Sequence, residues 1–125
     1  MENLKIKETV TSPKIDFDSE SNIHSISGES YSDNMYLFYD PVMAWLEEYL
    51  EKLQVDATFN IELRYFNSSS SKVLMDIFYM FEDAAADGKQ ITVNWIYDQD
   101  NEALEEYGEE FAEDTDKLLF NIVQK

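Results

Sequence analysis

The residues TFNIELRYF (58–66), NSSSS (67–71) and KVLMDIFYMFEDAA (72–85) decide the fold, because the apolar period changes within them. Every second residue of 58–66 is apolar, which predicts a strand. Its apolar face would hold Phe59, Ile61, Leu63 and Tyr65. The serines interrupt this alternation, and helical spacing follows from Val73 to Ala85. We therefore expect a helix that begins near Ser70 or Ser71 and ends at Asp87-Gly88.

The same change of period recurs toward the C-terminus. Residues 91–97 alternate and predict another strand. Asp100 is a candidate cap for a third helix that runs to about Ala112. Residues 118–123 predict a last short strand.

Toward the N-terminus, Asp40-Pro41 predicts a helix start, because a capping carboxylate followed by proline is typical of one. Residues 14–18 and 23–26 predict two short strands joined as a hairpin, and residues 28–34 have the composition of a loop. Strands that alternate with helices favour right-handed crossovers and a largely parallel sheet. We expect one α/β domain over residues 1–125, with a mixed, mainly parallel sheet of about five or six strands and helices mostly on one face.

The composition limits the classes of function. The chain has 125 residues, no cysteine and a net charge of −18. Such a charge is repelled by nucleic-acid phosphates and anionic lipid, so we expect neither as a direct partner. The absence of cysteine fits a reducing cytosol, and no stretch resembles a signal peptide or a membrane helix, so we expect a cytoplasmic protein. The charge also suits an alternative function, an acidic protein that mimics nucleic acid and occupies a DNA-binding groove.

Candidate catalytic groups are few. His24 is the single histidine, and we interpret it as a half-exposed residue of an edge strand rather than a metal ligand. Glycines at 28, 88 and 108 cannot form a phosphate-binding loop. The spacing of Asp98, Asp100 and Glu102 resembles a calcium loop but lacks its glycine and distal glutamate. We expect no enzyme, no metal and no cofactor.

The serine run is the strongest candidate site. It falls where a strand ends and a helix begins, and the first turn of a helix has backbone N–H groups without intrahelical partners. A phosphate on a serine there would be received by these N–H groups, with Lys72 nearby. Plain N-capping by one serine is the alternative interpretation, although four serines exceed what a cap requires.

Several segments also resemble a known family. They are Thr11-Ser12-Pro13-Lys14-Ile15, Gly28-Glu29-Ser30-Tyr31-Ser32-Asp33-Asn34, Phe38-Tyr39-Asp40-Pro41, Trp45-Leu46, Tyr65-Phe66-Asn67-Ser68-Ser69-Ser70-Ser71-Lys72, Trp95-Ile96-Tyr97-Asp98 and Gly108-Glu109-Glu110-Phe111. Across about residues 11–120 the chain resembles the SiaC-type biofilm regulatory phosphoproteins, whose domain is similar to the STAS fold of anti-sigma-factor antagonists.

The resemblance implies a phosphorylation switch. The unmodified form would bind a diguanylate cyclase and promote cyclic-di-GMP synthesis, and a serine/threonine kinase and a phosphatase would control it. In related antagonists the partner is instead a sigma-regulatory kinase, which stays an alternative. The modified residue maps to Ser68, where the family has threonine, and Ser69 is a rival acceptor. The residues that the resemblance assigns to partner binding are Asn67, Ser70, Lys72, Gly28, Glu29, Tyr31 and Asn34.

Overall fold

The computed structural model covers residues 1–125 and contains one six-stranded sheet in the order β1-β2-β3-β4-β5-β6. The strands are β1 (Leu4–Ile6), β2 (Lys14–Asp18), β3 (Ile23–Ser30), β4 (Ala57–Phe66), β5 (Ile91–Tyr97) and β6 (Leu119–Gln124). The helices are α1 (Met35–Lys52), α2 (Ser68–Ala86) and α3 (Glu102–Glu113).

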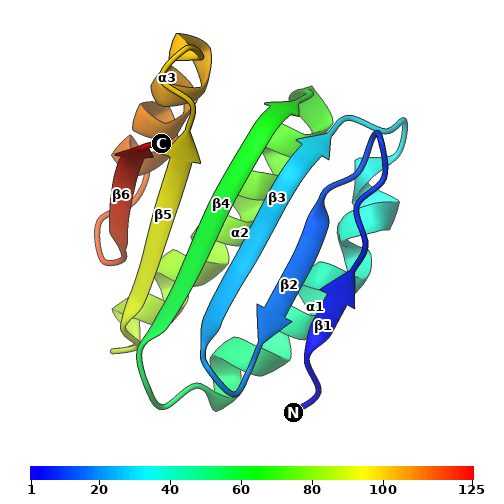
Figure 1. Cartoon of the computed structure of the whole chain (residues 1–125). Helices are drawn as coiled ribbons and strands as arrows, with labels where there is room; N and C mark the ends of the chain where they lie inside the picture. Colours follow the sequence, from blue (N-terminus) through cyan, green and yellow to red (C-terminus); the bar gives the residue numbers. More distant parts are fainter.

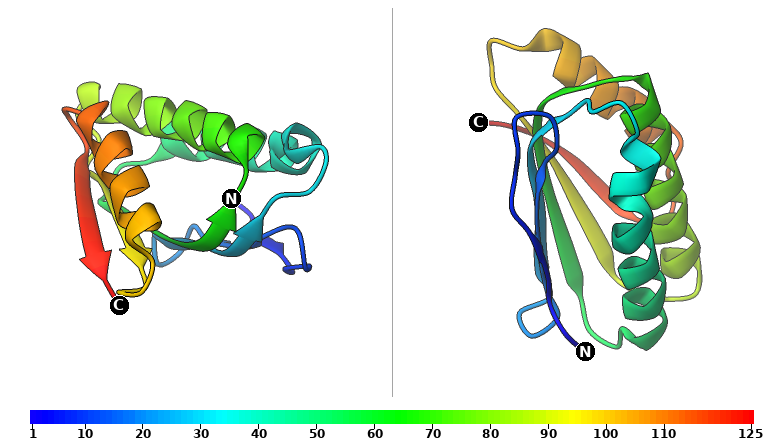
Figure 2. Two further views of the ribbon diagram at one scale, coloured as in Figure 1. Left: turned by 90° about the horizontal axis from the view of Figure 1, so that it is seen from above. Right: turned by 90° about the vertical axis from the view of Figure 1, so that its right-hand side faces the viewer.

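The sheet is mixed and mainly parallel (Figure 1). Strands β1, β2 and β3 pair antiparallel, and β3, β4, β5 and β6 pair parallel through the three helical crossovers. All three helices cover the same face of the sheet and leave the other face open (Figure 2). The predicted class, strand number and one-sided helical layer are therefore confirmed. No helix is long and apolar enough to cross a membrane.

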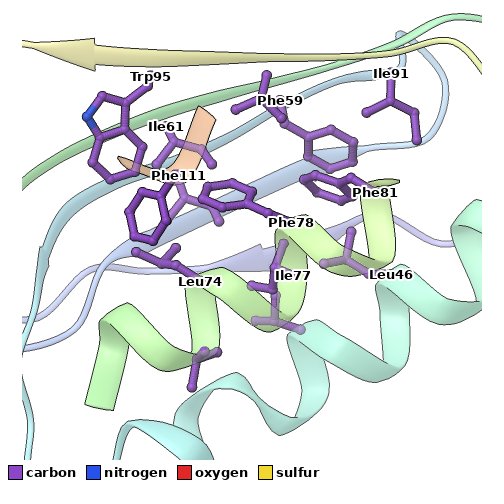
Figure 3. Close-up of a cluster of buried hydrophobic side chains, with 14 of the residues drawn as sticks. Leu46, Phe59, Ile61, Leu74, Ile77, Phe78, Phe81, Ile91, Trp95 and Phe111 are labelled. Carbon is purple, nitrogen blue, oxygen red and sulfur yellow. The ribbon is translucent and has the colours of Figure 1, made fainter. Parts of the chain in front are cut away.

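The core lies between the sheet and the helices (Figure 3). Aromatic rings fill much of it: the Phe59 ring stacks on Phe81 at 4.2 Å, and Phe111 of α3 packs against Trp95 at 5.2 Å. The indole N–H of Trp95 donates to the carbonyl of Leu104 at 2.8 Å, which satisfies its one buried polar group.

Three helix starts differ from the predictions, and in each an asparagine provides the cap. Asn34 accepts from the Leu37 N–H at 3.2 Å, so α1 begins before Asp40-Pro41 and Pro41 lies inside it on the exposed side. The predicted helix start at Pro41 was wrong, although proline suits a first turn.

The other two helices begin one to three residues from the expected positions. Asn67 caps α2, which starts at Ser68 rather than near Ser70 or Ser71. Asn101 rather than Asp100 caps α3, with its side-chain oxygen accepting from the Leu104 N–H at 3.3 Å. The short amide side chain of asparagine is as good a cap as aspartate or serine.

Two predictions for the N-terminal strands were also wrong. Gly28 to Ser30 belong to β3 rather than to a loop, and the added strand β1 lies outside β2. Strand β3 is an inner strand because it pairs with both β2 and β4, and His24 is fully buried instead of half-exposed. Its Nδ1 accepts from the Asp18 N–H at 3.0 Å, and its Nε2 has no hydrogen-bond partner. Burial lowers the pKa of His24 to about 4.

One irregularity in β4 changes which side chains face the core. Gly28 pairs with Leu63 and Glu29 pairs with Tyr65, so Arg64 is an extra residue without a partner in β3. A bulge of this kind breaks the alternation of the strand. Tyr65, expected on the inner face with Leu63, is 53% exposed, and Phe66 is buried instead.

Candidate functional site

The N-terminus of α2 is held in place by Asn67. Its N–H donates to the carbonyl of Ser30 in β3 at 3.1 Å, and its side-chain oxygen accepts from the Ser70 N–H at 3.0 Å. The Ser69 hydroxyl also donates to this oxygen, at 3.1 Å. The helix cap is therefore an asparagine, which leaves the serine run free of the capping role that was its alternative interpretation.

The serines at this turn have different environments. Ser68 is exposed, and its hydroxyl has no hydrogen-bond partner. Ser69 is half-buried and bonded to the cap, whereas Ser70 is fully buried. The Ser70 N–H donates to the Asn67 side chain and the Ser71 N–H to its carbonyl, so the N–H groups of Ser68 and Ser69 stay free at the start of the helix.

A buried hydroxyl network lies directly under this turn. The Ser70 hydroxyl donates to the carbonyl of Ser30 at 2.6 Å, and its oxygen is 2.8 Å from the Ser30 hydroxyl. The Ser30 hydroxyl is 2.9 Å from the phenol oxygen of Tyr39 in α1. Because the single Ser70 proton is used on the carbonyl, Ser30 must donate to Ser70 and Tyr39 must donate to Ser30. Burial raises the pKa of Tyr39 to about 12, so it stays a donor.

The segment from Gly28 to Asn34 meets this turn through Ser30, at the end of β3. Gly28 is buried with a φ of +113°, a conformation that favours glycine. Glu29 lies 3.8 Å from the guanidinium of Arg64, and Tyr31 packs edge-on against Tyr65 with ring centroids 5.4 Å apart. Asn34 serves as the cap of α1.

The predicted site residues thus divide into two groups. The residues that are at least partly exposed can be contacted by a partner: Ser68, Ser69, Glu29, Tyr31, Asn34 and Lys72. Gly28 and Ser70 are buried and support the site from beneath, while Asn67 fixes the turn.

Lys72 lies one helical turn beyond Ser68. It makes no ion pair and lines a groove of about 340 Å³ between α2 and α3. Ser68 and Ser71 line the same groove, as do Glu110 of α3 and its C-cap, Asp114. Lys72, the only lysine in this groove, is therefore available to attract a phosphate on the turn. The carboxylates of Glu110 and Asp114 in the same groove would repel that phosphate.

Sequence reasoning missed the residues that join this turn to the rest of the fold. Ser30 and Tyr39 form the buried network, and Arg64 and Tyr65 flank the turn on β4. Ser30 and Tyr39 occur within the segments that carried the family resemblance, which is the signal that was available. Their contact with Ser70, forty positions from Ser30 in the chain, depends on the fold.

The family model described as "SiaC family regulatory phosphoprotein" matches residues 6–125, so the class of protein is a regulatory phosphoprotein. The chain belongs to this family.

Solved structures support the assignment. The chain is similar to apo-SiaC from Pseudomonas aeruginosa, with a TM-score of 0.90, 34% identity and coverage of 100% of this chain and 99% of that one. It is equally similar to SiaC in the crystal structure of the diguanylate cyclase SiaD in complex with its activator SiaC, also from P. aeruginosa. There the TM-score is 0.92 at 34% identity over 98% of this chain and 99% of that one. An uncharacterised protein of P. aeruginosa strain UCBPP-PA14 is 36% identical over 114 residues, which cover 91% of this chain and 90% of that protein.

Proposed function

We propose that this protein binds and activates a diguanylate cyclase while Ser68 is unmodified, and that phosphorylation of Ser68 releases the cyclase. A serine/threonine kinase would set the switch and a phosphatase would reset it. The observation that carries the proposal is the exposed, unbonded hydroxyl of Ser68 at the N-terminus of α2. This serine occurs in a chain that is similar to SiaC. The SiaC of P. aeruginosa is the activator of the diguanylate cyclase SiaD in the crystal structure of their complex.

The hydrogen bonds favour Ser68 over Ser69 as the acceptor. A phosphate on Ser68 breaks no existing hydrogen bond and lies beside the free N–H groups of Ser68 and Ser69. A phosphate on Ser69 removes the hydroxyl that donates to Asn67 and places negative charge against the same capping oxygen. Modification of Ser69 would therefore weaken the cap of α2, whereas modification of Ser68 would not.

The surface around Ser68 has the apolar character of a docking site. Tyr65 is 53% exposed beside the turn. Helices α1 and α2 begin at the same end of the sheet, where β3 and β4 finish (Figure 1), and the first turn of α1 presents Tyr36 at 44% and Leu37 at 69% exposure. Tyrosine is enriched in binding hot spots, and the exposed leucine extends the apolar surface beside the two tyrosines. We propose that the cyclase covers these residues and the Ser68 hydroxyl together.

A phosphate in such a contact would oppose binding. Phosphorylation adds a charge of about −1.5 to −2, and burial of that charge without a cation costs several kcal/mol. A micromolar complex has a binding free energy of about −8 kcal/mol, so this penalty is enough to dissociate it at ordinary concentrations. The fold itself would tolerate the charge, because the helix terminus receives it locally. The protein would then act by binding, without catalysis of its own.

Titration calorimetry against SiaD tests the proposal with four forms of the protein. We expect wild type and Ser68→Ala to bind, and Ser68→Asp and enzymatically phosphorylated protein to bind at least tenfold more weakly. Gln54→Glu is the matched control, because it adds one negative charge at an exposed position in the loop before β4, at the opposite end of that strand from Ser68. The proposal is wrong if wild type does not bind, or if the phosphorylated protein binds as tightly as wild type.

A further inference from the structure

Strand β6 is an open edge of the sheet. Figure 2 shows no helix or strand beyond it, and β5 is the only strand that pairs with it. The N–H of Lys125 donates to the carbonyl of Tyr97 at 2.8 Å, so the odd-numbered residues of this strand face β5. Successive residues of a strand alternate in direction, and the backbone N–H and C=O groups of Phe120, Ile122 and Gln124 consequently face away from the sheet. Open edges of this kind are templates for pairing with another strand.

The segment that forms this edge carries no acidic residue, in contrast to the rest of the chain. Residues 117–125 contain two lysines and no acidic residue, although the chain has a net charge of −18. The residues of β5 and β6 on the open face are all uncharged: Thr92, Asn94, Ile96, Leu119, Asn121 and Val123. Two of them are exposed and apolar, Leu119 at 58% and Val123 at 39%. A second copy of a strongly acidic protein can approach here with little local repulsion.

We propose that two copies of this protein pair through β6, antiparallel about a twofold axis at Ile122, to form one continuous sheet. In this register Phe120 bonds with Gln124 of the second copy, and the outward backbone groups of both strands are satisfied. Leu119 lies across from Lys125 of the second copy, and Val123 lies across from Asn121. The edge is self-complementary because the residues that face outward are spaced symmetrically about Ile122.

The contact leaves the Ser68 turn accessible. Strands β5 and β4 separate β6 from β3, and Ser68 lies at the end of β4. Pairing of two copies through β6 is thus independent of the proposed phosphorylation switch. The Ser68→Asp variant should pair with the same dissociation constant as wild type.

Sedimentation equilibrium over a range of protein concentrations tests the pairing. The wild-type mass should rise from 14.7 kDa toward twice that value. Raising the salt concentration should strengthen association, because salt screens the repulsion between two acidic molecules. A wild-type protein that stays monomeric up to millimolar concentration, at low and high salt, overturns the proposal.

Two variants locate the interface. Leu119→Lys places a like charge across from Lys125 of the second copy, and Gln124→Pro removes an outward N–H without removing a bond to β5. Each should raise the dissociation constant at least tenfold while the melting temperature stays within a few degrees. Val55→Lys is the matched control, because Val55 is 57% exposed at a distant turn and receives the same charge. If Leu119→Lys and Gln124→Pro associate as the control does, β6 is not the interface.

Discussion

Replacement of Ser70 by alanine should destabilise the protein more than replacement of Tyr39 by phenylalanine, although each removes one hydroxyl from the same network. In the wild type, each of the three buried hydroxyl protons has an acceptor. Tyr39→Phe leaves Ser30 and Ser70 with their acceptors. Ser70→Ala leaves a buried O–H, on Ser30 or on Tyr39, without one. The Ser30 carbonyl keeps one donor, the Asn67 N–H.

The expected loss of unfolding free energy follows from the number of hydrogen bonds lost and of buried donors left without an acceptor in each variant. A lost hydrogen bond costs about 1 kcal/mol, and a buried donor without an acceptor adds about 1–3 kcal/mol. Alanine offsets about 0.5 kcal/mol through its higher helix propensity. We expect a loss of about 2–3 kcal/mol for Ser70→Ala and about 1 kcal/mol for Tyr39→Phe. For a chain of this size each kcal/mol lowers the melting temperature by about 3–5 °C.

Urea unfolding at 25 °C, followed by circular dichroism, measures both free energies, and thermal melts provide the second estimate. A Tyr39→Phe variant that loses as much stability as Ser70→Ala would refute the assignment of the protons. Equal losses would mean that the tyrosine accepts rather than donates, so that its removal also leaves a donor without an acceptor.

Three other perturbations have definite outcomes. Burial lowers the pKa of His24 from 6.5 to about 4, so protonation favours the unfolded chain. Stability should fall as the pH drops from 6.5 toward 4, by about 3 kcal/mol, and urea unfolding of His24→Phe should lack this part of the loss. In Gly108→Ala the new Cβ would lie 2.4 Å from Cδ1 of Trp95, so we expect a loss of about 1–3 kcal/mol and altered tryptophan fluorescence. The Glu82 carboxylate accepts from the N–H groups of residues 116–118, and Glu82→Ala should accelerate hydrogen exchange of these three amides by about tenfold.

The spacing of apolar residues predicted the helices and strands well where contacts with the rest of the fold do not change their bounds. The strands 14–18 and 91–97 have the expected bounds, because their alternation is regular and turn residues flank them. Helix starts were less accurate. For α2 and α3, the neighbouring residues Ser68 and Asp100 are as good caps as Asn67 and Asn101, so the sequence does not decide between them. For α1, the Asp40-Pro41 pair has the pattern of a helix start, but the cap is Asn34, six residues earlier.

The position of the candidate site could be proposed from the sequence, whereas the residues that support it could not. A serine run between a strand and a helix points to the turn, and the exposure of Ser68 agrees with that interpretation. Nothing local indicates that Ser70 is fully buried while Ser68 is exposed, because both are serines in one helical turn. Their difference arises from Ser30 and Tyr39, which approach from β3 and α1. The burial of His24 was missed for a similar reason, since it depends on the strand order.

The extra residue in β4 has a consequence for how the Ser68 turn can vary among related chains. Because Arg64 has no partner in β3, the strand reaches its end half a period out of phase, with Tyr65 outward and Phe66 inward. The number of residues in the strand sets these side-chain directions, and they do not depend on which side chain occupies the extra position. Substitutions at Arg64 can tune charge near the turn without rotating it. Deletion of one residue from the end of β4 would point Tyr65 inward and Phe66 outward, and would change the direction in which the following serines face. We therefore expect the number of residues in this segment to be the same in related chains, even where the residue types differ.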